Sequence, residues 1–332
     1  MSHYHHLSIS ERESIWESVL QGKSLRQIAG ELGRSVSTIS RELKRNQSGR
    51  SYRPSVAQET YKHRRLHSRR RLVLAEGELR NTVIKLLVEK QWSPEQISHR
   101  LALERGKQVI SYSTIYRALQ CGCMEPKGKR KNRMGRYPMQ KHLRRKGWRG
   151  KGKSRKPLAH IHQTIDERPK AAQNRKQFGH WEGDLVYSSF HKVYIVTLVE
   201  RHSRYLLTGT SKTKQPEEIA ETICALLKPL PAQKLRTITL DRGTEFSLHS
   251  KITQQIPNAA FFFAHPHSPW ERGTNENTNG LLRQYIPKRT YKVPFSQDLL
   301  REFTDKLNHR PRKCLGWKTP FEVFSRKVLH LT

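Results

Sequence analysis

Two hydrophobic periodicities divide the chain into two parts. Over roughly the first 125 residues, apolar positions recur every three or four residues, which is typical of amphipathic helices. From about residue 171 onward, alternating and β-branched apolar runs indicate strands, with helical stretches between them. The pattern therefore predicts an all-α N-terminal region followed by an α/β domain.

Three helices are expected in residues 1–47, in an order typical of a helix-turn-helix domain. Ser10-Glu-Arg-Glu13 and Ser24-Leu-Arg-Gln27 have the spacing of capping boxes, in which a serine and a glutamate or glutamine bond the free amides of a helix start. Gly33 makes a turn before a third helix that Ser35 can cap. A helix, a glycine-containing turn and a second helix form the helix-turn-helix pattern.

The outward face of the third helix suits DNA. Small polar residues at its start can reach base edges, and its arginines and lysine can bind phosphates or guanine. A plain three-helix bundle with a solvated basic face would show the same pattern, so that alternative stays open here. The candidate DNA-contact residues are Ser35, Ser37, Thr38, Arg41, Lys44 and Arg45.

Two segments follow this domain. Residues 48–75 are polar and basic and are expected to form a connector. Residues 76–125 repeat the helical periodicity and predict a second helix-turn-helix unit. In this unit Ser93-Pro-Glu-Gln96 starts one helix and Ser113 can cap the next. The role of the second unit is either DNA binding or dimerisation.

The charge of the chain points to a polyanionic partner. Lysine and arginine number 64 against 28 acids, which gives a formal net charge of +36, far above what solubility needs. The basic residues are densest in a linker expected at residues 126–170. Such a run cannot build its own core and is expected to follow phosphates. DNA or RNA is therefore the expected partner.

Composition argues against several other classes of protein. No run of about 18 apolar residues occurs, so no membrane span is expected. No apolar signal core follows Met1, so we expect a cytoplasmic protein. The four cysteines include no Cys-x-x-Cys pair, so neither a structural zinc site nor a disulfide framework is expected.

The C-terminal part, residues 171–328, has the element order of a ribonuclease-H-like α/β fold. Three strands in short succession predict an antiparallel meander, and a helix then crosses to a parallel strand. The expected strands cover residues 183–189, 192–200, 204–210, 237–240 and 259–264, and the expected helices cover 216–227, 246–256, 274–285 and 295–307.

Three acids in this domain are candidate metal ligands. Asp184 lies within the first strand, Asp241 ends an apolar strand, and Glu276 lies on an expected helix. Two Mg²⁺ ions about 3.5–4 Å apart can activate a nucleophile and neutralise the leaving oxygen of a phosphodiester, and they prefer carboxylate ligands. Arg283 shares a helix face with Glu276, so we expect it to contact a DNA phosphate.

Neighbouring acids are alternatives to this trio. Glu182 would share the strand face of Asp184 and could be the ligand instead. Glu271 lies just before the expected helix, and Glu245 most simply caps or precedes the helix that follows it. An isolated acid is more often a surface or capping group than a ligand, so residue pattern alone leaves the choice open.

The chain resembles the IS30 family of insertion-sequence transposases. The resemblance covers nearly the whole chain and lies in long, specific motifs, both in the predicted helix-turn-helix units and in the α/β domain. The matching runs include Gly-Arg-Ser-Val-Ser-Thr-Ile-Ser-Arg-Glu42, Gln-Trp-Ser-Pro-Glu-Gln-Ile97, Gly-His-Trp-Glu-Gly-Asp184, Asp-Arg-Gly-Thr-Glu-Phe246 and the segment from Trp270 to Lys288.

The resemblance implies a DDE transposase with a retroviral-integrase-like core, whose ligands would be Asp184, Asp241 and Glu276. It implies binding to the element's terminal inverted repeats in double-stranded DNA. It also implies two Mg²⁺ ions, with Mn²⁺ as substitute, and 3′-hydroxyl ends that attack target DNA. Arg283 and Lys288 would contact DNA. Because two ends must be joined, a homodimer or larger assembly is expected.

Two other interpretations stay open at this point. A phage-type integrase would share the chemistry of the three acids. A DNA-binding regulator that has lost catalysis would explain the helix-turn-helix pattern, although it would not explain the acids.

Overall fold

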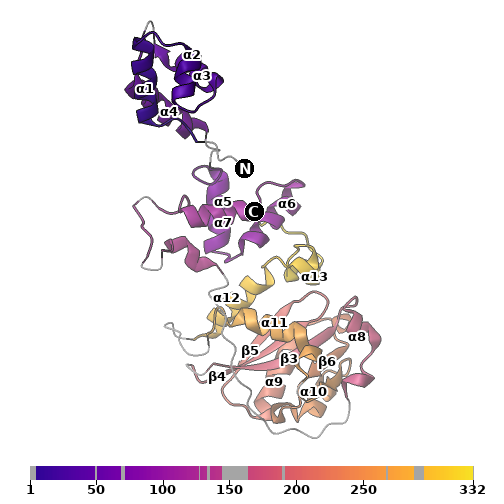
Figure 1. Ribbon diagram of the computed structural model, residues 1–332. Helices are drawn as coiled ribbons and strands as arrows, with labels where there is room; N and C mark the ends of the chain where they lie inside the picture. Colours follow the sequence, from indigo (N-terminus) through magenta and orange to yellow (C-terminus); the bar gives the residue numbers. More distant parts are fainter. Residues whose placement is uncertain are drawn as a thin grey trace. The chain divides into compact units, whose positions relative to one another are not determined.

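The computed structural model describes residues 5–48, 51–68, 72–126, 128–132, 135–143, 164–188, 191–266, 268–287 and 295–331. The chain divides into two compact units, Met1–Leu72 and Val73–Thr332 (Figure 1). Lys288 and much of the linker predicted at 126–170 lie outside the described residues.

The first unit is a helical domain around a helix-turn-helix. Ile15, Ile28 and Ile39, one from each of the first three helices, are fully buried and form its core with Ala57 from the fourth. Gly33 has a φ of 60°, a left-handed conformation that suits glycine at the turn between α2 and α3. The elements are α1 (Ile9–Leu20), α2 (Leu25–Glu31), α3 (Val36–Asn46), β1 (Gln47–Ser48), β2 (Ser51–Tyr52) and α4 (Pro54–Ser68).

The helix starts in this unit are set by serine caps. Ser24 forms the predicted capping box of α2. The box predicted at Ser10 is wrong, because α1 begins at Ile9 and its box joins Ser8 to Glu11. Ser10 lies inside the helix, where the amides of the following residues donate to the helix ladder.

A buried arginine ties the fourth helix to the others. Helix α4 lies within the segment predicted as a connector at 48–75, and it packs against α1 and α3. Arg12 Nε donates to Glu42 Oε1 on α3 (2.7 Å), and Arg12 Nη1 donates to Gln58 on α4. The compact unit consequently extends to Leu72.

The second unit begins with three more helices. Leu86, Ile97 and Ile115, one from each helix, are fully buried in a shared core. The helices are α5 (Glu78–Val88), α6 (Pro94–Arg105) and α7 (Tyr112–Cys121).

Serine caps also start the second and third of these helices. Ser93 and Gln96 form the predicted capping box of α6. The cap predicted for α7 at Ser113 is wrong, because Ser111 accepts the backbone amide of Thr114 and the helix begins between the two serines. Ser113 is already in the first helical turn.

A five-stranded sheet in the order β5-β4-β3-β6-β7 organises the rest of the unit. The first three strands pair antiparallel, and β6 and β7 pair parallel beyond β3. This is the predicted ribonuclease-H-like arrangement. The elements are β3 (His180–Ser188), β4 (Val193–Glu200), β5 (Leu206–Ser211), β6 (Thr237–Leu240), β7 (Ala260–Phe263), α8 (Lys170–Asn174), α9 (Pro216–Leu227), α10 (His249–Gln255), α11 (Gly273–Leu282), α12 (Gln297–Asn308) and α13 (Pro320–Ser325).

Helices cover both faces of this sheet (Figure 1). One face packs against α9 and α10, with Trp181 and Ile223 fully buried between the layers. The other face packs against α11 and α12, with Leu281 and Leu300 fully buried. A Cβ at Gly183 would lie 2.5 Å from Leu240 Cδ2, so any larger residue at this position of β3 would make the buried Leu240 side chain shift.

Arg100 joins the helical part of the second unit to the C-terminal segment. This side chain is 1% exposed, and its two terminal nitrogens each donate to a carboxylate oxygen of Glu322 at 2.7 Å. The same guanidinium donates to Glu104 and to the Leu329 carbonyl. Burial alone would raise the pKa of Glu322, but hydrogen bonds from Arg100 and from backbone amides outweigh burial and lower the pKa to about 2.

We expect Arg100→Met to lower the free energy of unfolding of the second unit by about 3 kcal/mol, because it leaves the Glu322 carboxylate buried without its cation. Urea unfolding followed by circular dichroism measures this change. The matched control is Arg301→Met, which removes an exposed ion pair with Asp298 and should cost less than about 1 kcal/mol. Equal effects of the two substitutions would contradict the anchoring role of Arg100.

Candidate active site

Parallel pairing of β3 with β6 brings two of the predicted acids together. The register pairs His180 with Thr237 and Glu182 with Thr239. Continuing the same register by two residues places Asp184 opposite Asp241, at the point where β6 ends. Carboxylates from two central strands therefore lie side by side at the carboxyl end of β6.

One guanidinium lies between the two carboxylates. Arg272 Nη2 donates to Asp241 Oδ2 at 3.2 Å, and Arg272 Nη1 lies 3.5 Å from Asp184 Oδ1. Nη1 also donates to the Gly183 carbonyl at 3.0 Å. This arginine, which ends the short helix Pro269–Arg272 just before α11, is a site residue that the sequence did not single out.

The outer oxygens of the two acids are held by other groups. Asn279 Nδ2 on α11 donates to Asp184 Oδ2 at 2.8 Å, and the Gly243 amide donates to Asp241 Oδ1 at 3.1 Å. Burial raises the pKa of Asp184, Arg272 opposes that rise, and the charge of Asp241 adds to it. Both carboxylates are thus oriented, and their repulsion is offset by one arginine.

Glu276 lies on the helix that faces these acids, but the structure does not draw its side chain into the pair. The side chain is exposed. It lies four residues after Arg272 and three before Asn279, the two residues that contact the aspartates. Residues at these spacings neighbour one another on a helix surface. Within the described part of the chain, no three acidic, histidine or cysteine side chains converge closely enough to hold a metal ion.

The alternative acid on β3 has a structural environment. Glu182 is fully buried. It forms an ion pair with Arg201 and accepts the backbone amide of Asn275 at 2.8 Å, which docks the start of α11 on β3. Its carboxylate therefore holds the helix in place.

The other two alternatives are also engaged elsewhere. Glu271 accepts hydrogen bonds from the backbone amide and the ring of His265, at 2.8 and 2.9 Å. Glu245 is buried and pairs with Lys214 at 2.9 Å. Neither acid contacts the aspartate pair through these partners.

Arg283 lies one turn beyond Asn279 on α11. Its Nη2 donates to the Tyr187 carbonyl at 2.9 Å, while Nη1 is buried without a hydrogen-bond partner. Burial lowers the pKa of Arg283, and the Asp184 charge opposes that shift. A cation with a donor to spare therefore lies near the acids.

The predicted DNA face of α3 is solvent-facing. Ser37, Arg41 and Lys44 are exposed on the side away from the buried Ile39. The Ser35 hydroxyl lies 2.8 Å from the hydroxyl of Thr38. The remaining candidate, Arg45, is exposed at the end of the same helix.

A sequence repeat gives α7 the same face as α3. Ser35-Val-Ser-Thr-Ile-Ser-Arg-Glu-Leu43 and Ser111-Tyr-Ser-Thr-Ile-Tyr-Arg-Ala-Leu119 share six of nine residues. The hydrogen bonds repeat too, since the Ser111 hydroxyl lies 2.8 Å from that of Thr114. Arg117, the counterpart of Arg41, is exposed. Aligning the two helix starts would have revealed this second polar face.

A basic groove of about 340 Å³ lies between α3 and α4 in the first unit. Arg41 and Arg45 line it from α3, and Arg64 and Arg65 line it from α4. Arg64 is held in place because its Nη2 donates to Asn46 Oδ1 at 2.5 Å. The groove therefore concentrates positive charge beside the predicted recognition helix.

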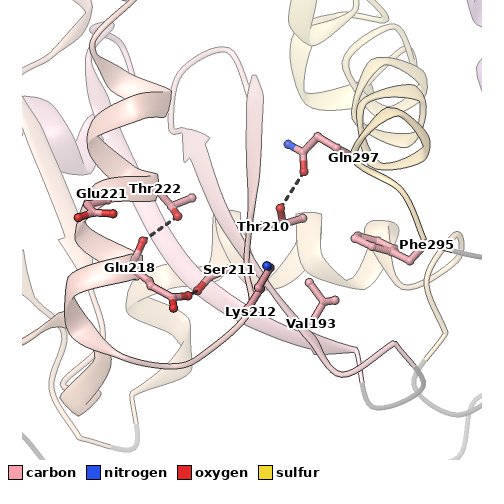
Figure 2. Close-up of a pocket in the computed structure, with 9 residues that line it drawn as sticks. All are labelled: Val193, Thr210, Ser211, Lys212, Glu218, Glu221, Thr222, Phe295 and Gln297. Carbon is pink, nitrogen blue, oxygen red and sulfur yellow. Dashed lines mark hydrogen bonds between the residues drawn. The ribbon is translucent and has the colours of Figure 1, made fainter.

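One hollow of the α/β domain has none of the candidate acids among its lining residues (Figure 2). It is a space of about 460 Å³ between the end of β5, α9 and the start of α12. Its polar groups bond one another: Ser211 donates to Glu218 at 2.7 Å, and Thr210 donates to Gln297 at 2.8 Å. These contacts hold the edge strand, so the hollow has no part in the candidate site. Among the described residues, no helix is long and apolar enough to span a membrane.

Known proteins resemble this chain along most of its length. Residues 3–46 match the model of a helix-turn-helix domain family. The transposase InsI of insertion sequence element IS30A from Escherichia coli is 38% identical over 97% of this chain and 84% of its own length. The transposase of insertion sequence element IS1086 from Cupriavidus metallidurans is 34% identical over 97% of this chain and 94% of its own.

Solved structures with a related core have low sequence identity. The catalytic core domain of BIV integrase superposes with a TM-score of 0.37 and 18% identity, and it covers 44% of this chain and 93% of its own.

Two substitutions separate the structural acid of β3 from the candidate ligand. Glu182→Gln should lower the free energy of unfolding by about 3 kcal/mol, because it leaves the Arg201 charge buried. Asp184→Asn should change it by less than about 1 kcal/mol, because it also removes repulsion from Asp241. Urea unfolding measures both values, and the reverse order of effects would exchange the two roles.

Proposed function

The chain belongs to the IS30 family of insertion-sequence transposases, and we propose that it cuts and joins DNA at the ends of its element with divalent metal ions held by Asp184, Asp241 and Glu276. The observation that carries this proposal is that Asp184 and Asp241, on two central strands of the sheet, both face the guanidinium of Arg272. The cation between them shows that the two carboxylates face a common position, which is where the first metal ion is proposed to bind.

The donor set fits a hard divalent cation. Carboxylate oxygens are the ligands that Mg²⁺ prefers, and a pair of Mg²⁺ ions (or Mn²⁺ as substitute) supplies nucleophile activation and charge neutralisation at a phosphodiester. Asn279 and the Gly243 amide orient the two aspartates from outside. Glu276 completes the set from the facing helix, where its exposed side chain is free to turn toward the acids.

Two cationic residues beyond the acids are proposed to hold the DNA. Arg283 has a buried Nη1 with no hydrogen-bond partner, and we propose that its side chain turns outward to bind a phosphate near the cleavage point. Lys288, five residues later, has the same proposed role. A phosphate held beside the acids would keep the scissile bond next to the carboxylates. The 3′-hydroxyl that cleavage frees would then attack target DNA.

Double-stranded DNA is the proposed partner, and both helix-turn-helix units are proposed to read the terminal inverted repeats. The support is the repeated polar face of α3 and α7, with Arg41 and Arg117 at matching positions. The basic linker at 126–170 would follow phosphates between the DNA-binding part and the catalytic domain at 171–328. Joining two ends requires at least a homodimer, and the cytoplasmic nucleoid is where such DNA lies.

The catalytic assignment predicts that Asp184→Asn, Asp241→Asn and Glu276→Gln each lower Mg²⁺-dependent cleavage and joining of an end-bearing DNA by at least about 10³-fold, since each removes a metal ligand. Gel assays measure both steps. Each variant should still bind the end in a mobility-shift assay.

Glu271→Gln is the matched control for the third ligand and should keep activity within about tenfold. Loss of activity in Glu271→Gln with activity retained in Glu276→Gln would move the third ligand to Glu271. Full activity in all the variants would leave only a DNA-binding regulator.

The double-reader assignment predicts that Arg41→Ala and Arg117→Ala each weaken binding to the element's end by about 1–3 kcal/mol. Mobility-shift titration at fixed salt measures the loss, with unrelated DNA as the competitor. The control is Arg105→Ala, which removes an exposed positive charge at the end of α6, outside both α3 and α7. Unchanged binding by Arg117→Ala would leave dimerisation as the role of the second unit.

A further inference from the structure

Arg272 contacts the two atoms through which the aspartates would share a metal ion. Of the four carboxylate oxygens, Asp184 Oδ2 and Asp241 Oδ1 are bound by Asn279 and by the Gly243 amide. The other two, Asp184 Oδ1 and Asp241 Oδ2, face the same guanidinium, at 3.5 and 3.2 Å. A metal ion that bridges the pair while Asn279 and the Gly243 amide keep their hydrogen bonds would bind these same inner oxygens.

The guanidinium is largely shielded from solvent and makes one further contact. Its side chain is 17% exposed, and the carbonyl of Gly183 accepts a third contact at 3.0 Å. Charge favours the arrangement as well, because two neighbouring carboxylates repel each other unless a cation lies between them. Arg272 therefore does for the two aspartates what a bridging cation would do.

We propose that Arg272 is a displaceable internal cation that competes with the divalent metal for Asp184 and Asp241 and thereby sets the metal affinity of the site. This inference rests on the proposed function, because it takes the two aspartates as metal ligands. Arg272 is a positioning residue in this account: it keeps the carboxylates together without metal and withdraws when metal is bound.

The segment that carries Arg272 is loosely packed, which would allow the side chain to move away from the aspartates. Arg272 ends a short 3-10 helix and is followed by Gly273, where an added Cβ would meet nothing within 4 Å. The preceding Trp270 is 72% exposed. The arginine thus lies on a lightly packed segment between β7 and α11, whereas the aspartates belong to the central strands.

The test measures metal binding by the full chain without DNA. Free Mn²⁺ is followed by electron paramagnetic resonance while the metal is titrated into wild type and Arg272→Gln. Arg272→Gln should bind Mn²⁺ at least about tenfold more tightly, because no internal cation has to be displaced. Arg272→Lys, which keeps the charge but loses the planar fork, should fall between the two.

Arg242→Gln is the matched control for a general change in charge. Arg242 follows Asp241 directly, but its Nε donates to the carbonyl of Ala264, just after β7, at 3.2 Å and not to either aspartate. This variant should change Mn²⁺ affinity by less than about threefold, since screening weakens charges that are not in contact. Equal tightening by Arg242→Gln and Arg272→Gln would overturn the proposal.

Thermal unfolding supplies a second readout that checks folding. Without metal, Arg272→Gln should melt below wild type because the two carboxylates then repel, and added Mn²⁺ should raise its melting temperature more than that of wild type. Unchanged or weaker Mn²⁺ binding by a folded Arg272→Gln or Arg272→Lys would overturn the role of Arg272.

The same titration separates this failure from failure of the proposed function. Asp184→Asn and Asp241→Asn should each lose Mn²⁺ binding. If these two variants bind Mn²⁺ as wild type does, the metal site itself is misplaced, and the proposal for Arg272 is overturned with it. If they lose binding while Arg272→Gln matches wild type, only the proposal for Arg272 is overturned.

Discussion

Electrostatic repulsion between two carboxylates on the central strands of the sheet is the constraint on which the surrounding structure depends. Parallel pairing of β3 with β6 sets Asp184 opposite Asp241, and each has to be neutralised or solvated. Three neighbouring groups donate hydrogen bonds or positive charge to the pair. They are Arg272 between the acids, Asn279 on α11 and the Gly243 amide just after β6. The position of α11 therefore matters to the site as much as the strands do.

The position of α11 depends in turn on a buried charge. The Glu182 carboxylate accepts the backbone amide of Asn275, in the first turn of the helix, and Arg201 neutralises it. The two acids of β3 thus have different roles. Glu182 docks α11 on the strand, whereas Asp184, two residues later, faces Arg272 beside Asp241. A buried carboxylate with a full set of partners is structural, whereas the half-exposed Asp184 keeps an oxygen that a cation can reach.

Buried arginines have a comparable role in both units. Arg12 joins three helices of the first unit through Glu42 and Gln58, and Arg100 joins α6 to the C-terminal segment through Glu322. In a chain with a net charge of +36, acids are scarce. Several of them form buried ion pairs of this kind, and removing one partner of such a pair lowers the free energy of unfolding.

The sequence by itself determined the class of the protein and the order of its elements, because hydrophobic periodicity and capping residues act locally. The ribonuclease-H-like strand order and the boxes at Ser24 and Ser93 followed from such local signals. Closely spaced serines misled the prediction at Ser10 and Ser113, since either serine of a pair can cap and packing selects one. Helix α4, expected as part of a connector, owes its place to a tertiary anchor on Arg12.

The candidate site shows the same division. The motifs singled out Asp184, Asp241 and Glu276, and their catalytic role stays a prediction. Only the tertiary structure decided that Glu182 is a docking group and that Arg272 lies between the aspartates. Both results depend on how a strand, a loop and a helix from distant parts of the chain meet. Hydrophobic periodicity along the chain cannot predict such contacts. Strand register and packing between distant segments decide which charged side chains pair.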